Sequence, residues 1–282
     1  MIGSESLSGV TLAYSGANVS RDGSGAVLSD KTITVSAAQA GSGTVLSDYA
    51  ISYVNNTASA ITPFAVSLAG TRVYDATTAV AASNFTIGTP LVGSETLGLT
   101  GSGTLADKNV GQNKAVGLGT LTLVDGTAGG LASNYALTGS RTATITRAAI
   151  SSVSGITATN KTYDGNDTAT LVTSGATFND MFSGDVLTVA TSSGVFSDAR
   201  AATGKTVSIS GITLGGTDAG NYTLTTSTAS TTATIDPKAL TVTALSQTKV
   251  YDSNTSVASN ALNVGYSVGT MVGSESLSGV TL

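Results

Sequence analysis

The stretch KTYDG at Lys161–Gly165, with DAGNYTL at Asp218–Leu224 and IDP at Ile235–Pro237 further along, decides how the chain is organised. The Tyr-Asp pair recurs at three positions, in steps of 163 − 74 = 89 and 251 − 163 = 88 residues: Tyr74-Asp75, Tyr163-Asp164 and Tyr251-Asp252. The stretch therefore belongs to one copy of a repeating unit.

Two further landmarks have nearly the same period. A Gly-Ser-Glu or Gly-Asp sequence begins at four glycines, in steps of 90, 91 and 89 residues: Gly3, Gly93, Gly184 and Gly273. An Asn/Asp-Tyr-x-Leu/Ile sequence occurs three times, in steps of 86 and 87 residues: Asp48-Tyr49, Asn134-Tyr135 and Asn221-Tyr222. Three independent landmarks predict a repeat of about 88 residues.

The repeat divides the chain into four parts. Residues 1–12 match residues 271–282 at every position except Ile2 against Val272, so the sequence begins and ends at the same phase of the unit. We therefore expect a piece of a longer protein, composed of a back part, two complete repeats and a front part: residues 1–62, 63–148, 149–237 and 238–282. Because a unit cut in its middle exposes strand edges, copies of the chain could complete each other head to tail.

The joints between the units are short, and two of the three prolines, Pro63 and Pro237, lie at them. Proline fixes φ and thereby stiffens the backbone. Short, stiff joints predict an elongated, semi-rigid array in which the partners of a repeat are its neighbours in the same chain.

Composition excludes several classes of protein. Charged residues make up 10% of the 282 residues, and the net charge of −5 comes without a basic stripe, which excludes nucleic acid and acidic membrane surfaces as partners. The chain has no Cys, so it has neither a disulfide scaffold nor a thiolate metal site. Because no run of 18 or more apolar residues is present, we expect no membrane insertion.

Alternation of apolar and hydroxyl residues is the dominant local pattern, and it predicts strands that pack one face inward. It is found in eight runs: residues 64–68, 115–118, 121–123, 143–145, 186–190, 206–210, 232–235 and 240–244. We find no amphipathic helix. About seven short strands per unit favour an all-β fold of tandem immunoglobulin-like β-sandwiches. The alternative is a β-grasp-like repeat with a short helix.

One detail favours the immunoglobulin-like version. In Asp218-x-x-x-Tyr222 the tyrosine follows the aspartate by four positions, as in a tyrosine corner, where the hydroxyl ties a strand end to a neighbouring loop. The other copies have Val45 and Leu131 at the aspartate position, so the analogy is limited to one copy.

The segments Lys161–Gly165, Gly184–Leu187, Gly216–Leu224 and Ile235–Lys238 resemble the YDG-type repeat of very large bacterial surface adhesins, including those of the filamentous haemagglutinin type. The resemblance extends over nearly the whole chain. It implies an exported spacer or adhesive repeat at the bacterial cell surface, with the export signal upstream of this sequence. It implies no catalytic residues.

The recurring motif residues are candidates for a structural role: Tyr74, Asp75, Tyr163, Asp164, Gly165, Tyr251, Asp252, Asn134, Tyr135, Asn221 and Tyr222. Recurrence in every unit favours a buried tyrosine and an aspartate that hydrogen-bonds the backbone of the following turn. The alternative is an exposed tyrosine that contacts carbohydrate or protein. Because Ala76 and Ser253 replace Gly165 in the other copies, we expect that a backbone conformation reserved for glycine is not essential there.

Oxygen-bearing residues of the turns could hold calcium: Asp164, Asn166 and Asp167, with Asp198 or Asp218. They lack the fixed loop spacing of calcium sites, so we expect no cofactor and keep calcium as the alternative. The chain has neither His nor Cys, and therefore lacks the common general base and the best nucleophile. We expect that it is not an enzyme.

The function that we expect is that of a structural stalk or spacer in a bacterial cell-surface adhesin. Such repeats would be extracellular and would support adhesion or biofilm formation. The alternative is a repeat module that itself binds a glycan or a host protein through its turns.

Overall fold

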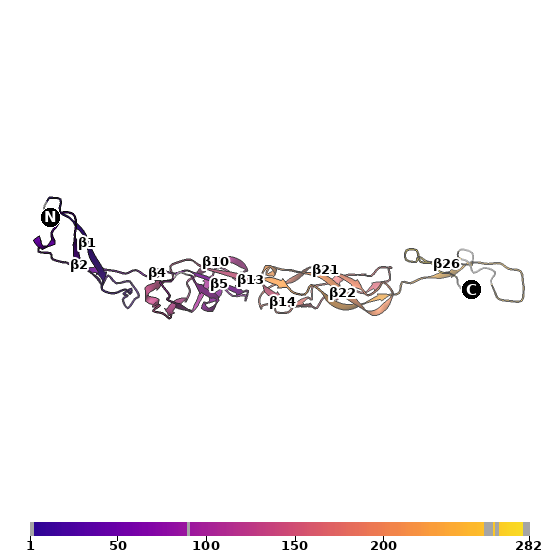
Figure 1. The fold of residues 1–282 in the computed structure, drawn as a ribbon. Helices are drawn as coiled ribbons and strands as arrows, with labels where there is room; N and C mark the ends of the chain where they lie inside the picture. Colours follow the sequence, from indigo (N-terminus) through magenta and orange to yellow (C-terminus); the bar gives the residue numbers. More distant parts are fainter. Residues whose placement is uncertain (1–2, 89–90, 257–261, 263–264, 279–282) are drawn as a thin grey trace. The chain divides into compact units, whose positions relative to one another are not determined.

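The computed structural model describes residues 3–88, 91–256, 262 and 265–278. As predicted, the protein is all-β: the described residues contain strands and four short 3₁₀ turns, and no α-helix (Figure 1). The chain forms two compact units, residues 1–146 and 147–282, which we describe separately.

The first unit begins with the back part of a repeat. Its elements are β1 (Leu7–Tyr14), β2 (Lys31–Ala40), η1 (Leu46–Asp48) and β3 (Asn56–Ser59). They form an antiparallel sheet in the order β1-β2-β3, in which Lys31 of β2 pairs with Ser59 of β3.

The first complete repeat follows within the same unit. Its elements are β4 (Phe64–Ala65), β5 (Leu68–Val73), β6 (Ala79–Ala81), η2 (Ala82–Asn84), β7 (Phe85–Ile87), β8 (Leu97–Thr100), β9 (Ser102–Leu105), β10 (Gly111–Gly117), β11 (Thr122–Asp125), η3 (Ala132–Asn134), β12 (Tyr135–Ala136) and β13 (Arg141–Thr146). The main sheet has the order β6-β9-β10-β13-β5-β7, and β11 pairs with β8 and β12 with β4 beside it.

The second unit contains the second complete repeat and the front part of another. Its elements are β14 (Ala148–Ile150), β15 (Val153–Ser154), β16 (Thr157–Ala158), β17 (Lys161–Thr162), β18 (Thr168–Ala169), β19 (Leu171–Val172), β20 (Thr177–Phe178), β21 (Thr188–Phe196), β22 (Ala202–Gly215), η4 (Ala219–Asn221), β23 (Tyr222–Leu224), β24 (Ala229–Asp236), β25 (Val242–Ala244) and β26 (Tyr266–Val268). The main sheet has the order β17-β24-β22-β21-β18.

The two complete repeats share one topology. The order β17-β24-β22-β21-β18 corresponds to β5-β13-β10-β9-β6, and the pair β14–β23 corresponds to β4–β12. In both repeats the first strands run parallel to the last, as in Leu68 opposite Arg141 and Lys161 opposite Ile235. The sheets are therefore mixed, and the beginning and end of each repeat are hydrogen-bonded to each other.

The predicted alternation determines which side chains of a strand are buried in the core. Along β22 the side chains of Lys205, Val207 and Ile209 are buried, whereas the intervening Thr206 and Ser208 are exposed. The equivalent strand β10 buries Val116. Hydroxyl residues thus form the outer face and branched apolar residues the inner one.

The strands differ from the predicted set of about seven per unit, because many are shorter and more numerous. Residues 152–178, for example, form pieces of two residues, β15–β20. Glycines such as Gly155, at φ 73°, interrupt this stretch, since glycine readily adopts a left-handed conformation that a strand does not use. The short helix of the β-grasp alternative is not found among the described residues.

Candidate functional site

The Tyr-Asp loop of the second complete repeat is built around the ammonium group of Lys161. Its Nζ lies 2.8 Å from Asp164 Oδ1, 2.8 Å from Asn166 Oδ1, 2.8 Å from the Asn166 carbonyl oxygen and 3.1 Å from that of Thr168. Asp164 Oδ1 also accepts the backbone N–H of Asn166 at 3.1 Å. A single cation therefore holds the loop closed through four oxygen atoms.

The front part contains the same loop. Lys249 Nζ lies 2.8 Å from Asp252 Oδ1, 3.0 Å from Asn254 Oδ1 and 2.8 Å and 2.9 Å from the carbonyl oxygens of Asn254 and Ser256. Asp252 accepts the backbone N–H of Asn254 at 3.2 Å. The loop thus keeps its geometry in a repeat of different sequence.

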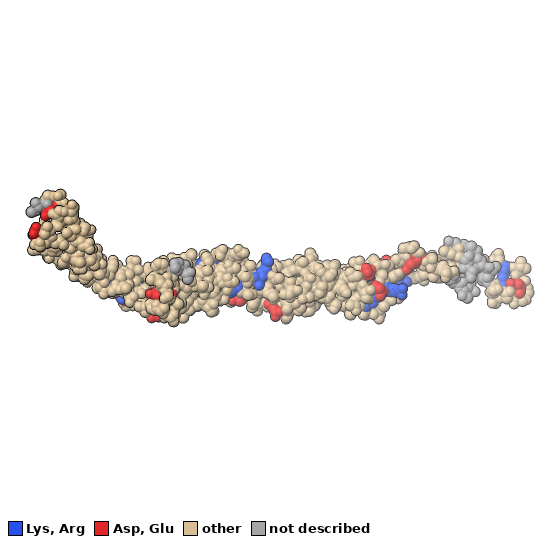
Figure 2. Space-filling view, in the orientation of Figure 1, with Lys and Arg blue, Asp and Glu red and all other residues tan. Residues whose placement is uncertain are grey.

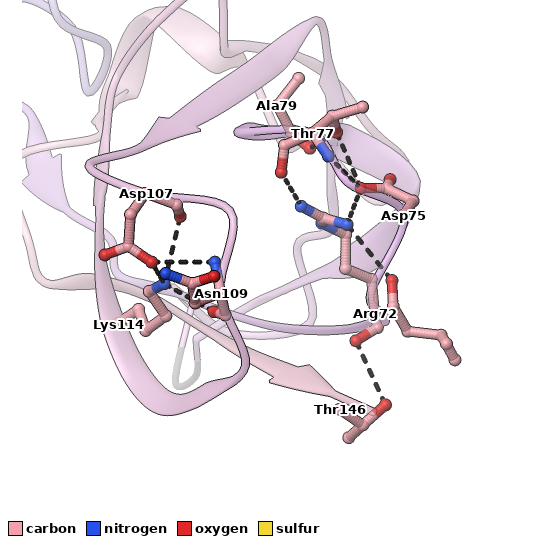
Figure 3. A network of polar contacts seen from close by, with 9 residues as sticks. Arg72, Asp75, Thr77, Ala79, Asp107, Asn109, Lys114 and Thr146 are labelled. Atoms are coloured by element: carbon pink, nitrogen blue, oxygen red, sulfur yellow. Dashed lines mark hydrogen bonds and ion pairs between the residues drawn. The ribbon is translucent and has the colours of Figure 1, made fainter. Parts of the chain in front are cut away.

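In the first complete repeat an arginine takes the place of the lysine (Figure 3). Arg72 forms an ion pair with Asp75 and donates to the Thr77 carbonyl oxygen at 2.6 Å. Asp75 Oδ1 accepts the backbone N–H of Thr77 at 2.9 Å and its hydroxyl at 2.8 Å. The Thr146 hydroxyl donates to the Arg72 carbonyl oxygen at 3.3 Å, which links the loop to the last strand, β13.

The residue after the aspartate has a left-handed backbone in all three copies. The φ angles are 61° at Ala76, 81° at Gly165 and 63° at Ser253. The expectation from sequence was therefore only half right. The turn uses the conformation that favours glycine, and alanine and serine adopt it at an energetic cost.

A second cation-centred loop occurs in each complete repeat. Lys114 pairs with Asp107, which accepts the Asn109 backbone N–H at 2.9 Å (Figure 3). In the second repeat Lys205 Nζ lies 2.7 Å from Asp198 Oδ1. The aspartate and lysine are seven residues apart in both loops, and this shared spacing is the signal by which the ion pair could have been predicted from sequence.

Each of these carboxylates is held in its charged form. The hydrogen bond from Lys161 and then that from the Asn166 backbone lower the pKa of Asp164, and Lys249 does the same for the pKa of Asp252. For Asp75, burial acts to raise the pKa, but hydrogen bonds from Thr77 and the charge of Arg72 outweigh it and lower the pKa. At neutral pH each of these loops therefore contains an ion pair between its lysine or arginine and its aspartate.

The tyrosine of the Asn/Asp-Tyr landmark donates a hydrogen bond to the carboxylate of the Gly-Ser-Glu landmark. The hydroxyl of buried Tyr135 donates to Glu95 Oε2 at 2.5 Å and accepts the Val92 backbone N–H at 3.1 Å. Burial and then the hydrogen bond to Glu95 raise the pKa of Tyr135. In the back part Tyr49 donates in the same way to Glu5.

The second complete repeat has an aspartate in place of the glutamate. The Tyr222 hydroxyl donates to Asp185 Oδ2 at 2.6 Å and accepts the Phe182 backbone N–H at 3.0 Å. Asp218 Oδ2 accepts the Val186 backbone N–H at 2.9 Å, so it ties the same loop. The hydroxyl does tie a strand end to a loop, but that loop lies 222 − 185 = 37 residues upstream.

Both landmarks are visible in the sequence, whereas the hydrogen bond between them is seen only in the structure. The available signal was a similar separation in the three copies, 135 − 95 = 40, 222 − 185 = 37 and 49 − 5 = 44 residues. The asparagines that precede the two buried tyrosines, Asn134 and Asn221, differ in their surroundings. Asn221 is buried, and Asn134 accepts the Val19 backbone N–H at 2.8 Å and donates to Asn18 Oδ1 at 2.9 Å.

The tyrosines of the Tyr-Asp pair differ in exposure. Tyr74 is buried, Tyr163 is partly buried, and Tyr251 is 89% exposed. The Tyr163 hydroxyl donates to Glu275 of the front part. Beside it lies a hollow of about 640 Å³, whose walls include Arg200 and Lys238.

The oxygens proposed for calcium are used by other groups. Those of Asp164 and Asn166 surround Lys161, and Asp198 pairs with Lys205. Within the described part of the chain, no three or more His, Cys, Asp or Glu residues gather in a way that could hold a metal ion.

The surface carries few charges. In the view of Figure 2, blue and red residues are scattered over a surface of uncharged residues and form no basic stripe. Among the described residues no helix has the length and apolar character needed to cross a membrane.

The comparisons with known proteins identify the repeat. The YDG domain matches residues 57–144 and 146–231, which together are 88 + 86 = 174 of the 282 residues. No curated protein and no solved structure matches the chain. The two matched segments cover more than half of the sequence, and they confirm the YDG-type repeat expected from it. The chain therefore belongs to the YDG domain family.

Proposed function

We propose that these YDG repeats are non-enzymatic spacer modules of an extracellular bacterial surface adhesin, in which they hold adhesive regions away from the cell. The supporting observation is how the recurring polar residues are used. Lys161 closes a loop around Asp164, and Tyr222 joins Asp185. These groups make internal contacts that maintain a unit, which is what a stalk requires.

Each repeat is proposed to be a sandwich of the immunoglobulin-like kind. The tie between Tyr222 and the Asp185 loop supports it, because it connects a strand end to a neighbouring loop as a tyrosine corner does. A crystal structure of residues 63–148 would test this by showing whether two sheets pack face to face.

Small-angle scattering on the full chain tests the spacer function. A compact globule of 282 residues would have a radius of gyration of about 19 Å, and an unfolded chain about 59 Å. A stiff array of units is expected to give a value clearly above the first, with a profile typical of folded segments. A radius of gyration near 19 Å would overturn the proposal.

The alternative function is recognition of a glycan or host protein by the turns. The observation that favours it is the hollow beside Tyr163, since an aromatic ring with Arg200 and Glu275 nearby combines stacking and hydrogen-bonding groups. A glycan array probed with the full chain and with Tyr163→Ala tests it. Hits lost in Tyr163→Ala but kept in Tyr251→Ala would support this site, and the absence of hits would exclude glycans as its ligands.

A further inference from the structure

The first complete repeat joins its beginning to its end through a parallel ladder of backbone hydrogen bonds. Strand β5 pairs with β13 at six successive positions, beginning with Leu68 opposite Arg141. A backbone hydrogen bond of 2.8 Å from the Tyr74 N–H to the Thr146 carbonyl oxygen extends the ladder beyond β5. The two strands are therefore held together along their whole length.

The ladder lies inside the six-stranded sheet, since β10 flanks β13 and β7 flanks β5. Four side chains of the two strands are buried: Leu68, Arg72, Ala143 and Ile145. Hydrogen bonds that are shielded from water in this way are stronger than exposed ones, because the local dielectric constant is low. The ladder is thus protected from the competition of water.

The parallel direction of the strands decides how a pulling force acts on the ladder. The chain enters β5 at its amino-terminal end, at Leu68, and leaves β13 at its carboxyl-terminal end, at Thr146. In a parallel pair these are opposite ends of the ladder. Tension along the chain therefore slides the two strands past each other and loads all their hydrogen bonds at once. Antiparallel first and last strands would instead be opened one bond at a time.

The second complete repeat has the same geometry with a shorter ladder. Strand β17 pairs with β24 at two positions, Lys161 opposite Ile235 and Thr162 opposite Asp236. A second parallel pair, β14 with β23, is separated from the first along the chain by β15 and β16, which pair with β20 and β19. Strand β17 also stands at the end of its sheet order, whereas β5 is internal.

We propose that the complete repeats are tension-bearing modules, in which the parallel ladder between first and last strands resists extension of the chain. The first repeat, with the longer and internal ladder, withstands tension longer than the second. This inference rests on the spacer function, since a spacer that holds an adhesive region is pulled from both of its ends. It goes further, because a spacer needs only length, whereas the ladder keeps a repeat folded under load. The rate of unfolding governs that resistance.

Changing the direction of the load within one repeat tests the ladder, and the absence of natural Cys allows handles to be attached at chosen positions. One full-length chain carries handles at Thr62→Cys and Thr146→Cys, and another at Thr62→Cys and Ser140→Cys, all of them exposed positions. The first pair of handles pulls the ladder from opposite ends. The second pair pulls it from the end where Leu68 lies opposite Arg141, so its hydrogen bonds break one after another.

At the same constant force, we expect the Ser140 attachment to unfold the first repeat at least about ten times faster than the Thr146 attachment. A factor of ten corresponds to roughly one net hydrogen bond in the barrier. Urea unfolding of both chains without handles is the control, since a destabilised fold would open faster in either geometry. If Ser140→Cys destabilises the fold, Thr138→Cys offers a second exposed position before β13. Equal lifetimes under force would overturn the proposal.

Extending the full chain from its ends tests the ranking of the two repeats. A disulfide between Thr71→Cys and Thr144→Cys, which lie opposite each other in the ladder, closes a loop of 144 − 71 = 73 residues. It should shorten the extension released by the first repeat by about 250 Å. We expect the later of the two unfolding events of the complete repeats to shorten. Shortening of the earlier event would overturn the ranking, and with it the role given to ladder length.

The spacer function and the load-bearing ladder can fail separately. A compact chain in small-angle scattering would overturn the spacer function. An elongated chain whose first repeat unfolds equally fast in both pulling directions would overturn the ladder and leave the spacer function standing.

Discussion

The two complete repeats reach the same geometry with different residues. The first closes its Tyr-Asp loop with Arg72 and the second with Lys161. The first pairs its buried tyrosine with Glu95 and the second with Asp185. What is constant is a cation in the loop and an acid at the tyrosine hydroxyl, whereas the side chains that supply them vary.

The difference has an energetic side. Asp185 is buried, whereas Glu95 is partly exposed, so the two acids depend differently on the tyrosine hydroxyl. Similarly, the Arg72 side chain is more deeply buried than that of Lys161. Substitutions at equivalent positions should therefore change the free energy of unfolding by different amounts. The difference measures how much the contact stabilises each repeat.

The largest inequality is expected at the tyrosine hydroxyls. Tyr222→Phe removes a donor from the buried carboxylate of Asp185 and should lower the free energy of unfolding by about 2–3 kcal/mol. Tyr135→Phe should cost about 1 kcal/mol, because water can reach Glu95. Urea unfolding, with hydrogen exchange to assign the loss to one repeat, checks the values. Equal costs would mean that burial of the acid is irrelevant.

The cation of the Tyr-Asp loop comes next. Lys161→Met keeps the length of the side chain but removes the ammonium donor from the oxygens around it, and should cost about 1 kcal/mol, because these oxygens are exposed and water can replace the donor. The same urea measurement applies, with Lys238→Met as a control at an exposed lysine. If calcium raised the stability of the unmodified repeat, the loop would hold a metal rather than its own ammonium.

The pH dependence of this loop has a defined sign. The pKa of Asp164 is lowered in the folded protein, so the ion pair stabilises the fold above the unfolded pKa, near 4, and this contribution is lost as the pH falls through the folded pKa. The difference between the unmodified chain and Lys161→Met should therefore shrink below about pH 4. Unfolding measured from pH 7 to pH 2 checks this, and a difference independent of pH would contradict it.

Substitutions of the residue after the aspartate, Ala76 or Gly165, should change stability in opposite directions in the two repeats. Ala76→Gly relieves a left-handed alanine and should stabilise the first repeat by about 0.5 kcal/mol. Gly165→Ala should destabilise the second unit by about 1 kcal/mol or more, since a Cβ there would lie 2.6 Å from Val272 Cγ1. Thermal unfolding of each variant measures both. A loss of stability in Ala76→Gly would contradict the assignment of strain to Ala76.

Much of this architecture was predictable from sequence. The recurring landmarks predicted the YDG-type repeat, and alternation as in residues 206–210 predicted strands with the correct inner face, because both depend on local sequence. The pairing of first with last strands was not predictable, since Leu68 and Arg141 are far apart and nothing local records their register. The partners of the hydroxyls were missed for the same reason, although a similar spacing of 37 to 44 residues separates the tyrosine from its acid in the three copies.

The smallest expected effect tests whether the two cations are interchangeable. The buried Nε of Arg72 has no hydrogen-bond partner within the described residues, and an unsatisfied buried donor is costly. Lysine has no such group, and Lys161 shows that its ammonium fits this loop. Arg72→Lys should therefore raise the free energy of unfolding by less than about 0.5 kcal/mol, because the gain is offset in part by bonds of Arg72 to Thr77 and Asp75 that a lysine replaces incompletely. Thermal unfolding of Arg72→Lys is compared with that of the reciprocal substitution Lys161→Arg, which should lower the stability of the second repeat. If both exchanges destabilised their repeats, each loop would be adapted to its own cation.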